Sequence, residues 1–283
     1  MRGFKGGLTG RLRILTYWLA RKDIRQRVGI VELIRHSFTP RCETIAPRFS
    51  ERKYEDDEYV YYSVKGFDSL LSYPKELPYH NFAQVISEGF LQYHWHYYEI
   101  PQTKVRKGDI VVDCGSAEGF FAFKHVNSCK HIYCIEPLPV FCRALHKLYD
   151  DFENVTVIQT ALSNEIGALY LSPSSVSSSC RSVAVNEDDI LVEAVTLDSL
   201  FADRSIQIDY LKADLEGFEE MMIIGGLQTI VMSRPKIVIT TYHPGQDYRV
   251  LINAVRAVVP EYKYLVKGVE EIAGNPVMLH MWC

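Results

Sequence analysis

The most informative stretch of this sequence is Val111-Val-Asp113-Cys-Gly115-Ser-Ala-Glu-Gly119-Phe120. An apolar run ends in an acid, and the chain then turns through two glycines. Glycine adopts left-handed backbone conformations at little cost, so Gly115 permits a sharp turn and a close approach of the backbone to a ligand. Gly119 would allow the next helix to begin close against the strand. The stretch therefore predicts a strand, a tight turn and a helix whose first N–H groups favour an anionic group.

Residues on the C-terminal side of this stretch follow a regular pattern. From Lys107 onward, short apolar runs alternate with segments of helical spacing, which is typical of a parallel sheet with crossover helices. We predict seven core strands, the last two forming an antiparallel edge, over residues 109–113, 131–136, 154–158, 208–213, 235–240, 262–266 and 277–282. Helical spacing predicts helices over residues 119–126, 138–149, 218–232 and 248–259. The predicted fold is therefore α/β, with a doubly wound sheet.

Two segments depart from this alternation. Apolar runs at residues 168–171 and 191–195 flank a serine-rich segment and predict an inserted hairpin. The serine-rich residues 172–179 are either a surface loop or a lid over the substrate. Residues 1–100 show no regular pattern, so they are predicted to be an irregular, partly helical N-terminal extension that covers the substrate or serves as an interaction region. Residues 101–283 are predicted to be the α/β domain.

The spacing of the glycines distinguishes between two kinds of nucleotide cofactor. Folds that bind a dinucleotide carry G-x-G-x-x-G, which leaves room for a pyrophosphate on the turn. Here the pattern is D-x-G-x-x-x-G, and the carboxylate of Asp113 would repel a pyrophosphate but attract an ammonium or sulfonium group. We therefore predict S-adenosylmethionine rather than NAD as the cofactor, bound in this turn by Asp113, Gly115, Ser116 and Gly119.

Two further positions fit this cofactor. Glu136 ends the next predicted strand and is followed by Pro137, and an acid at this position can accept both ribose hydroxyls. The segment Thr160-Ala161-Leu162 follows the third predicted strand, where an adenine ring would lie. Each position also has a simpler interpretation, a solvated strand end for Glu136 and a core or loop segment for the other. Their combination with the glycine turn favours the cofactor site.

The composition restricts the class of protein. Apolar residues make up 47% of the chain and charged residues 23%, which is ordinary for a globular enzyme. The net charge of −4 gives no reason to expect a nucleic acid partner. The cysteines lack C-x-x-C spacing, so neither a disulfide framework nor a zinc site is predicted, and Cys114, Cys134 and Cys142 are expected to be buried. No apolar run reaches the about 20 residues that span a bilayer, and no signal peptide is recognisable, so we expect a cytoplasmic protein.

The first 27 residues are strongly basic, with eight Lys or Arg residues against a single acid, Asp23. Within this segment Leu12, Leu15, Trp18 and Leu19 recur at helical spacing. A basic amphipathic helix of this kind either packs on its own protein or lies on a membrane surface or a partner. We predict a helix here, and the sequence leaves its placement open.

Taken together, these motifs resemble the FkbM family of methyltransferases over residues 107–243. The resemblance is carried by Asp113-Cys-Gly-Ser-Ala-Glu-Gly119, Glu136-Pro137, Thr160-Ala-Leu-Ser163, Thr196-Leu-Asp198, Gly225-Gly226, Pro235 and above all Leu211-Lys-Ala-Asp-Leu-Glu-Gly-Phe-Glu219. It implies a class I methyltransferase fold, which is a Rossmann-like, doubly wound, seven-stranded sheet. It also implies methyl transfer from S-adenosylmethionine to a small-molecule or glycan acceptor, typically a hydroxyl of a sugar, a polyketide or another secondary metabolite.

Three polar residues follow core strands at the same edge of the sheet and are predicted to be catalytic. Asp214 ends the strand beside the first one, at the point where the strand order reverses and ligands bind, and Glu216 lies two positions later. His243 follows the fifth strand, and histidine is the best base near neutral pH. Asp214 and Glu216 would bind the acceptor hydroxyl or a divalent cation, or else stabilise the start of a helix.

Two positions depart from the pattern of the family. Glu118 stands where the family often has asparagine. The fifth strand ends in Thr240-Thr-Tyr-His243, without the acid that usually precedes the histidine. Metal-dependent relatives of the fold use paired acids at this strand, so the sequence favours a mechanism without a metal. The alternatives are a catalytically silent scaffold, with the basic and aromatic N-terminal segments as interaction surfaces, and an NAD-dependent oxidoreductase, which the glycine spacing disfavours.

Overall fold

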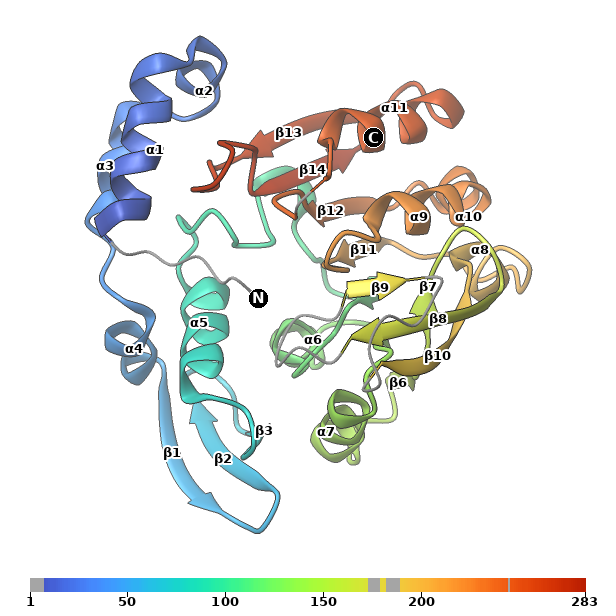
Figure 1. The fold of residues 1–283 in the computed structure, drawn as a ribbon. Helices are drawn as coiled ribbons and strands as arrows, with labels where there is room; N and C mark the ends of the chain where they lie inside the picture. The colour runs from blue at the N-terminus through green and yellow to red at the C-terminus, as the bar shows by residue number, and fades with distance from the viewer. Residues whose placement is uncertain (1–7, 173–178, 182–188, 244) are drawn as a thin grey trace. The chain divides into compact units, whose positions relative to one another are not determined.

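The computed structural model describes residues 8–172, 179–181, 189–243 and 245–283, and its fold is drawn in Figure 1. The chain divides into two compact units. The first unit comprises Glu99–Leu265 and His280–Cys283, and the second comprises Arg2–Tyr98 and Val266–Leu279. The candidate site lies within the first unit.

The main sheet has seven strands in the order β13-β14-β12-β11-β4-β5-β6. Their bounds are β4 Ile110–Cys114, β5 His131–Ile135, β6 Val155–Ile158, β11 Tyr210–Ala213, β12 Lys236–Thr240, β13 Lys263–Lys267 and β14 Met278–Trp282. Parallel pairing runs from β4 to β5 and on to β6, and from β4 to β11 and on to β12. The chain thus builds the sheet outward from β4 in one direction and then returns to the other side of β4. This order confirms the predicted doubly wound α/β fold and places a topological switch point between β4 and β11.

The helices of the first unit are η2 Pro101–Thr103, α6 Phe120–His125, α7 Pro139–Tyr149, α8 Leu197–Leu200, α9 Glu219–Ile224, α10 Leu227–Ser233 and α11 Tyr248–Val258. The single helix predicted over residues 218–232 was wrong, because α9 and α10 are separate helices. Gly225 and Gly226 lie between them, and a Cβ on Gly225 would be 2.2 Å from the backbone oxygen of Ser163. The close approach of these two backbones requires glycine, and the chain leaves helical geometry at that point.

Burial on both faces explains why the central strands were recognisable in the sequence. All four residues of β11 are buried, and Val111 and Ile239 in the neighbouring strands have 0% exposure. Strands covered on both faces contain continuous apolar runs, and fully burying one such side chain contributes roughly 1.5–3 kcal/mol. Cys114, Cys134 and Cys142 are buried in this core, as predicted.

A smaller sheet is inserted between β6 and β11 in chain order. Its strands lie in the order β7-β10-β8-β9, with bounds β7 Ala161–Leu162, β8 Gly167–Ser172, β9 Ser179–Arg181 and β10 Ile190–Val195. β8 and β10 are antiparallel, which confirms the predicted hairpin, and β10 pairs in parallel with β7. β9 begins at Ser179, the last residue of the segment predicted as a loop or lid, and residues 173–178 lie outside the described part of the chain.

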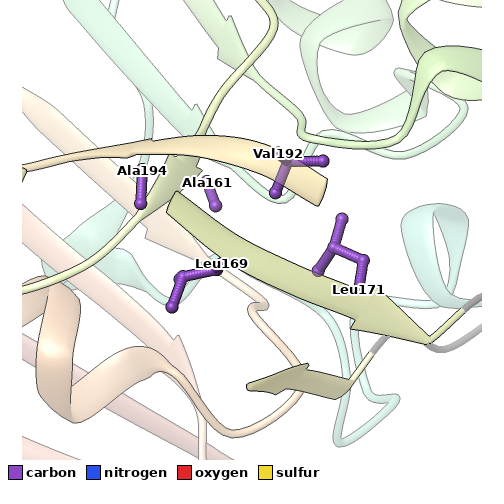
Figure 2. Packing of buried hydrophobic residues seen from close by; sticks show 5 residues of the cluster. All are labelled: Ala161, Leu169, Leu171, Val192 and Ala194. Carbon is purple, nitrogen blue, oxygen red and sulfur yellow. The ribbon is translucent and has the colours of Figure 1, made fainter. Parts of the chain in front are cut away.

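Buried side chains of the smaller sheet form a cluster of their own (Figure 2). Its members are Ala161, Leu169, Leu171, Val192 and Ala194, and the partly buried Leu138, Ile190 and Phe218 pack against it. Leu138 directly precedes α7 and Phe218 directly precedes α9. The cluster therefore holds Ala161, part of the segment predicted to contact adenine, beside two segments that border the candidate site.

The second unit contains regular structure that the sequence pattern of residues 1–100 did not reveal. Its helices are α1 Leu8–Ala20, α2 Lys22–Arg27, α3 Ile30–Ser37, α4 Cys42–Ile45, η1 Ala46–Arg48 and α5 Tyr79–Phe90. The strands β1 Ser50–Glu55, β2 Tyr59–Val64 and β3 Leu70–Pro74 form an antiparallel sheet. The core of the second unit is rich in aromatic residues. The rings of Tyr62 and Phe82 stack with centroids 3.9 Å apart, and Trp95 is 1% exposed. Aromatic residues occur in strands, helices and buried loops alike, so they carried no clear periodicity.

Helix α1 confirms the helix predicted near the N-terminus. Ile14 is 1% exposed, and the indole N–H of Trp18 donates a hydrogen bond to the backbone oxygen of Val28 at 2.8 Å. One side of α1 therefore packs on its own unit. No helix in the described residues has both the length and the apolar character needed to cross a bilayer.

Candidate active site

A pocket lies at the switch point, where β4 and β11 end beside each other. It has about 690 Å³ of empty space, part of which is open to solvent. Eight of the predicted site residues line it, namely Gly115, Glu136, Pro137, Thr160, Ala161, Leu162, Asp214 and Glu216. The lining residues that were not predicted are Ala117, Ile135, Leu138, Phe141, Leu215 and Phe218.

The turn after β4 has the shape that its glycines predict. Gly115 has a φ of +72°, and a Cβ there would lie 2.0 Å from the backbone oxygen of Asp214. Only glycine allows the ends of β4 and β11 to approach so closely. Gly119, with a φ of +82°, directly precedes α6, and a Cβ there would lie within 3.2 Å of atoms of Leu145 and Tyr149. Gly119 therefore lets the turn pack against α7 and does not line the pocket.

Asp113 and Ser116 are not among the residues that line the pocket. The carboxylate of Asp113 is fully buried, and its Oδ1 is 2.8 Å from the Nζ of Lys212. Lys212 also donates to the backbone oxygen of Gly115 at 2.7 Å, and the hydroxyl of Ser116 donates to the backbone oxygen of Asp113 at 2.7 Å. Burial would lower the pKa of Lys212, but the charges of Asp113 and Asp214 raise it above its usual value. Lys212 thereby ties Asp113 to the turn, and the contact of Asp113 with a cofactor stays a prediction.

Glu136 lines the pocket with a carboxylate of fixed orientation. It is 5% exposed and accepts hydrogen bonds from the backbone N–H groups of Ala117 and Leu138, both at 3.0 Å. A carboxylate offers about four acceptor sites, so two remain for the hydroxyls of a ribose. Burial raises the pKa of Glu136 to about 7, because desolvation outweighs the two backbone donors that favour the charged form. This arrangement suits the predicted ribose-binding role.

The apolar part of the pocket suits a flat ring. Phe141 of α7 and Phe218 before α9 contribute aromatic side chains to the lining, together with Leu162. The hydroxyl of Thr160 donates to the backbone oxygen of Glu193 at 3.0 Å and thereby fixes the segment that carries Leu162. Sequence reasoning missed the two phenylalanines because an apolar residue beside or within an amphipathic helix usually packs in the core.

The three residues predicted to be catalytic meet at this edge of the sheet. Asp214 and Glu216 lie in the turn after β11, and His243 follows β12. The Nε2 atom of His243 is 3.2 Å from a carboxylate oxygen of Glu216 and 3.6 Å from one of Asp214. Both acids line the pocket, whereas His243 is 3% exposed and does not. Glu216 has a φ of +53°, so it occupies a left-handed conformation that few non-glycine residues adopt.

A fourth acid, Glu219, belongs to the same cluster, and sequence reasoning missed its role. It has 0% exposure, and its carboxylate accepts the backbone N–H groups of Leu215 at 2.8 Å and Gly217 at 3.0 Å. A carboxylate oxygen of Glu219 is also 3.1 Å from the Nδ1 atom of His243. Glu219 therefore closes the turn that carries Glu216 and orients the imidazole. Its signal in the sequence was a third acid within the six residues that begin at Asp214.

The neighbouring carboxylates determine the charge of His243. Burial would lower the pKa of His243, but Glu216, Glu219 and Asp214 together raise it well above its usual value. These carboxylates therefore favour the protonated form of the imidazole. Because Asp214 and Glu216 line the pocket and His243 does not, the two carboxylates are better placed than His243 to act as a base.

This fold and this pocket define a class, the Rossmann-like α/β proteins that bind a nucleotide-type cofactor at a topological switch point. A family model described as the methyltransferase FkbM domain matches residues 113–266. That range contains the whole pocket lining and the cluster around His243. The chain belongs to this family.

One solved structure of a protein with the same family name shares the fold, and two others match more weakly. The structure of methyltransferase FkbM from Methylobacillus flagellatus is 18% identical with a TM-score of 0.50, and the match covers 90% of this chain and 60% of that chain. This chain therefore spans about 60% of the length of that protein. Aeropyrum pernix fibrillarin in complex with S-adenosyl-L-methionine matches at 12% identity over 82% of this chain and 97% of that chain, with a TM-score of 0.41. Precorrin-6y C5,15-methyltransferase from Geobacter metallireducens matches at 10% identity over 74% and 93%, with a TM-score of 0.40. No curated protein matches the sequence significantly.

Proposed function

We propose that the protein transfers a methyl group from S-adenosylmethionine to a hydroxyl group of a small-molecule or glycan acceptor. One observation carries this proposal: a single pocket is lined by Glu136 and also by Asp214 and Glu216. The first acid suits a ribose, and the other two suit a hydroxyl that has to lose its proton. Membership of the FkbM methyltransferase family supports the same function.

The residues of the pocket fit S-adenosylmethionine. Glu136 would accept hydrogen bonds from the ribose hydroxyls, and Phe141, Leu162 and Phe218 would contact the adenine ring. When bound, S-adenosylmethionine supplies a methyl group activated by a positively charged sulfur. Asp214 and Glu216 favour a positive charge in the pocket and would repel the pyrophosphate of NAD.

Asp214 and Glu216 would orient the acceptor hydroxyl and accept its proton. The hydroxyl oxygen forms a bond to the methyl carbon while the carbon–sulfur bond breaks, and the hydroxyl proton passes to a carboxylate. Orientation can contribute about 7–11 kcal/mol of the rate enhancement, and a positioned base about 10²–10⁴-fold. His243, which lies between the carboxylates, would hold them in position.

Binding and turnover test the proposal separately. Calorimetry should show that the protein binds S-adenosylmethionine and does not bind NADH. Incubation with methyl-labelled S-adenosylmethionine and hydroxyl-bearing sugars or polyketides should give a methyl ether, detected by mass spectrometry. Glu216→Gln should lower turnover by about 10²–10⁴-fold and change cofactor affinity far less, because proton removal matters only in the transition state.

Two outcomes would contradict the proposal. Binding of NADH without binding of S-adenosylmethionine would indicate an oxidoreductase. Binding of S-adenosylmethionine with no methylated product from any acceptor class would indicate a catalytically silent scaffold.

A further inference from the structure

We propose that Asp214, Glu216 and His243 bind a divalent metal ion of the class that accepts mixed oxygen and nitrogen ligands, such as Mn²⁺. The role that we give this ion, activation of the acceptor hydroxyl, rests on the proposed methyl transfer. Binding of the ion does not depend on that function and can be measured by itself.

The spacing of the three side chains matches a metal coordination sphere. One ligand atom from each of Asp214, Glu216 and His243 can be chosen so that all three lie within 4.8 Å of one another. Neighbouring ligands of an octahedral ion with bonds of about 2.1 Å lie about 3 Å apart. The Nε2 atom of His243 is 3.2 Å from Glu216 and 3.6 Å from Asp214, so small movements would place all three around one ion.

The histidine is oriented as a metal ligand would be. Metal-binding histidines almost always donate their second ring N–H to a carboxylate, a backbone oxygen or a water. In this structure the Nδ1 atom of His243 is 3.1 Å from Glu219, which is itself held by the backbone N–H groups of Leu215 and Gly217. Nδ1 thus lies beside a fixed carboxylate, and Nε2 faces the two acids that line the pocket.

The ring nitrogens of His243 also lack well-formed hydrogen bonds. His243 is 3% exposed, yet neither nitrogen makes a hydrogen bond of ordinary geometry with any residue in the described part of the chain. Buried side-chain nitrogens nearly always have such a partner, so an exception requires an explanation. A metal ion at Nε2, with reorientation of Nδ1 toward Glu219, would satisfy both atoms.

The charges of the cluster favour a cation. The carboxylates of Asp214, Glu216 and Glu219 surround one imidazole, so negative charge exceeds positive charge among these four groups. Lys212, which precedes Asp214 by two positions, forms an ion pair with Asp113 and also interacts with the charge of Asp214, and even with Lys212 and Asp113 included the acids outnumber the basic groups. Close carboxylates repel each other strongly away from bulk water, and a divalent ion would offset that repulsion.

The position of this site gives the ion a chemical role. Asp214 and Glu216 line the pocket, so an ion between them and His243 would lie within reach of the acceptor hydroxyl. A metal-bound hydroxyl has a lowered pKa and loses its proton more readily. The paired acids that the sequence lacks on the fifth strand are thus replaced here by two acids in the turn after β11.

Direct binding of Mn²⁺ to the full chain tests this inference. After treatment with a chelator and its removal, titration followed by electron paramagnetic resonance should show about one bound Mn²⁺ per chain. Glu216→Gln and Asp214→Asn should each weaken Mn²⁺ binding by about 10–100-fold or more. Losses of that size follow when a residue that only hydrogen-bonds to a metal ligand is replaced, and removal of a ligand itself should cost at least as much. Both substitutions keep the size of the side chain, and thermal unfolding would verify that the variants remain folded.

A matched control exists in the second unit. Cys42, Glu43 and His80 form another group whose potential ligand atoms lie within 4.8 Å of one another. Glu43→Gln should leave the Mn²⁺ affinity of the proposed site unchanged. A folded wild-type chain that binds no Mn²⁺, or equal Mn²⁺ binding by wild type, Glu216→Gln and Asp214→Asn, would overturn the inference.

The same samples separate this inference from the proposed function. Calorimetry with S-adenosylmethionine and methyl transfer in excess chelator would be measured on the metal-free chain. Full methyl transfer without metal would overturn the role of the ion and leave the proposed function standing. Mn²⁺ binding without binding of S-adenosylmethionine would leave the metal site standing and contradict the proposed function.

Discussion

Glu136 combines an oriented carboxylate with a pKa that burial raises to about 7. Near neutral pH, part of the free protein therefore carries a proton on this group. A ribose hydroxyl donates its hydrogen bonds to the charged carboxylate, so cofactor binding has to displace that proton. Because Glu136 is protonated below its raised pKa, affinity should fall as the pH falls through 7 and should level off above it.

The first prediction follows from this competition. The affinity for S-adenosylmethionine should decrease by up to about tenfold per pH unit below pH 7, as linkage requires for one displaced proton. Glu136→Ala should weaken binding by about 1.5–3 kcal/mol at pH 8, the contribution of hydrogen bonds to a charged group, and should flatten the pH profile. Calorimetry at pH 6, 7 and 8 measures both effects.

A neighbouring acid provides the control for this prediction. Burial also raises the pKa of Glu118 to about 7, but Glu118 is not among the residues that line the pocket. Glu118→Gln should therefore keep the pH dependence. A flat wild-type profile, or a profile that disappears in Glu118→Gln, would remove Glu136 from its proposed role.

The ion pair between Asp113 and Lys212 gives the second prediction. Lys212→Met leaves a buried carboxylate without its partner, which typically costs about 3–5 kcal/mol of folding free energy. The double variant with Asp113→Asn should recover part of that loss, because no charge then remains buried. Urea unfolding would measure both, and a loss below about 1 kcal/mol in Lys212→Met would show that the pair is solvated in solution.

The partner of Asp113 illustrates what the sequence could not reveal at the scale of single residues. Asp113 and Lys212 are directly opposite each other in the parallel register of β4 and β11, although they lie 99 positions apart in the chain. The acid was recognisable from the glycine turn, but the register of two distant strands was not. Glu219 was missed for a related reason, since its contact with His243 depends on the neighbouring ends of β11 and β12.

Among the secondary-structure elements, the break between α9 and α10 depends on one backbone contact. Gly225 has a φ of −76°, which any residue can adopt, so its requirement for glycine is steric. A Cβ there would lie 2.2 Å from the backbone oxygen of Ser163 and 3.0 Å from the Cα of Asn164. Backbone atoms cannot rotate away as a flexible side chain can.

The third prediction compares two glycines. Gly225→Ala should destabilise the protein by about 1–3 kcal/mol or more, because the segment after β7 has to shift to admit the methyl group. Gly167→Ala is the matched control: no atom lies within 4 Å of its added Cβ, and the change should stay within about 0.5 kcal/mol. Chemical denaturation of both variants would measure the difference, and equal stability would show that the two segments are not in contact in solution.

Prediction of the elements succeeded where hydrophobic periodicity was strong. The strands of the doubly wound sheet and the helices α7 and α11 were found within a few residues of their bounds, because burial on one or both faces imposes a clear pattern. The two helices around Gly225 were joined because residues 218–232 keep an apolar, helical spacing across the glycines. The aromatic strands β2 and β3 gave no such pattern.

For the whole molecule, the question left by the sequence is what the basic N-terminal helices contact. Helices α1 and α3 belong to the second unit, and each buries an apolar side chain, Ile14 at 1% and Leu33 at 2% exposure. The apolar residues exposed on these two helices and at the C-terminal end of α3 are Leu12 at 53%, Leu15 at 40%, Leu19 at 63%, Ile30 at 50%, Val31 at 68%, Ile34 at 50% and Phe38 at 81%. Exposed arginines and lysines, namely Arg13, Lys22, Arg25, Arg35 and Arg41, accompany them.

An anionic membrane surface is the partner that this combination fits. Apolar side chains enter the boundary between headgroups and acyl chains, and basic side chains remain with the anionic headgroups. The whole chain carries a net charge of −4, so attraction would come from the basic residues of this segment and not from the overall charge. Burying one apolar side chain of this size contributes up to about 1.5–3 kcal/mol, so losing two of them should weaken binding at least about tenfold.

The final prediction is that the protein co-sediments with vesicles containing phosphatidylserine at low salt, and binds vesicles of phosphatidylcholine alone much less. Raising the salt to about 1 M, where charges are screened within about 3 Å, should weaken the binding to anionic vesicles. The double variant Val31→Ser, Phe38→Ser should lose most of the binding. Ile166→Ser is the matched control, because Ile166 in the first unit is 68% exposed, like Val31, but is far from these helices in the sequence. If the wild-type protein does not sediment with anionic vesicles at low salt, the exposed face of α1 and α3 does not serve membrane contact.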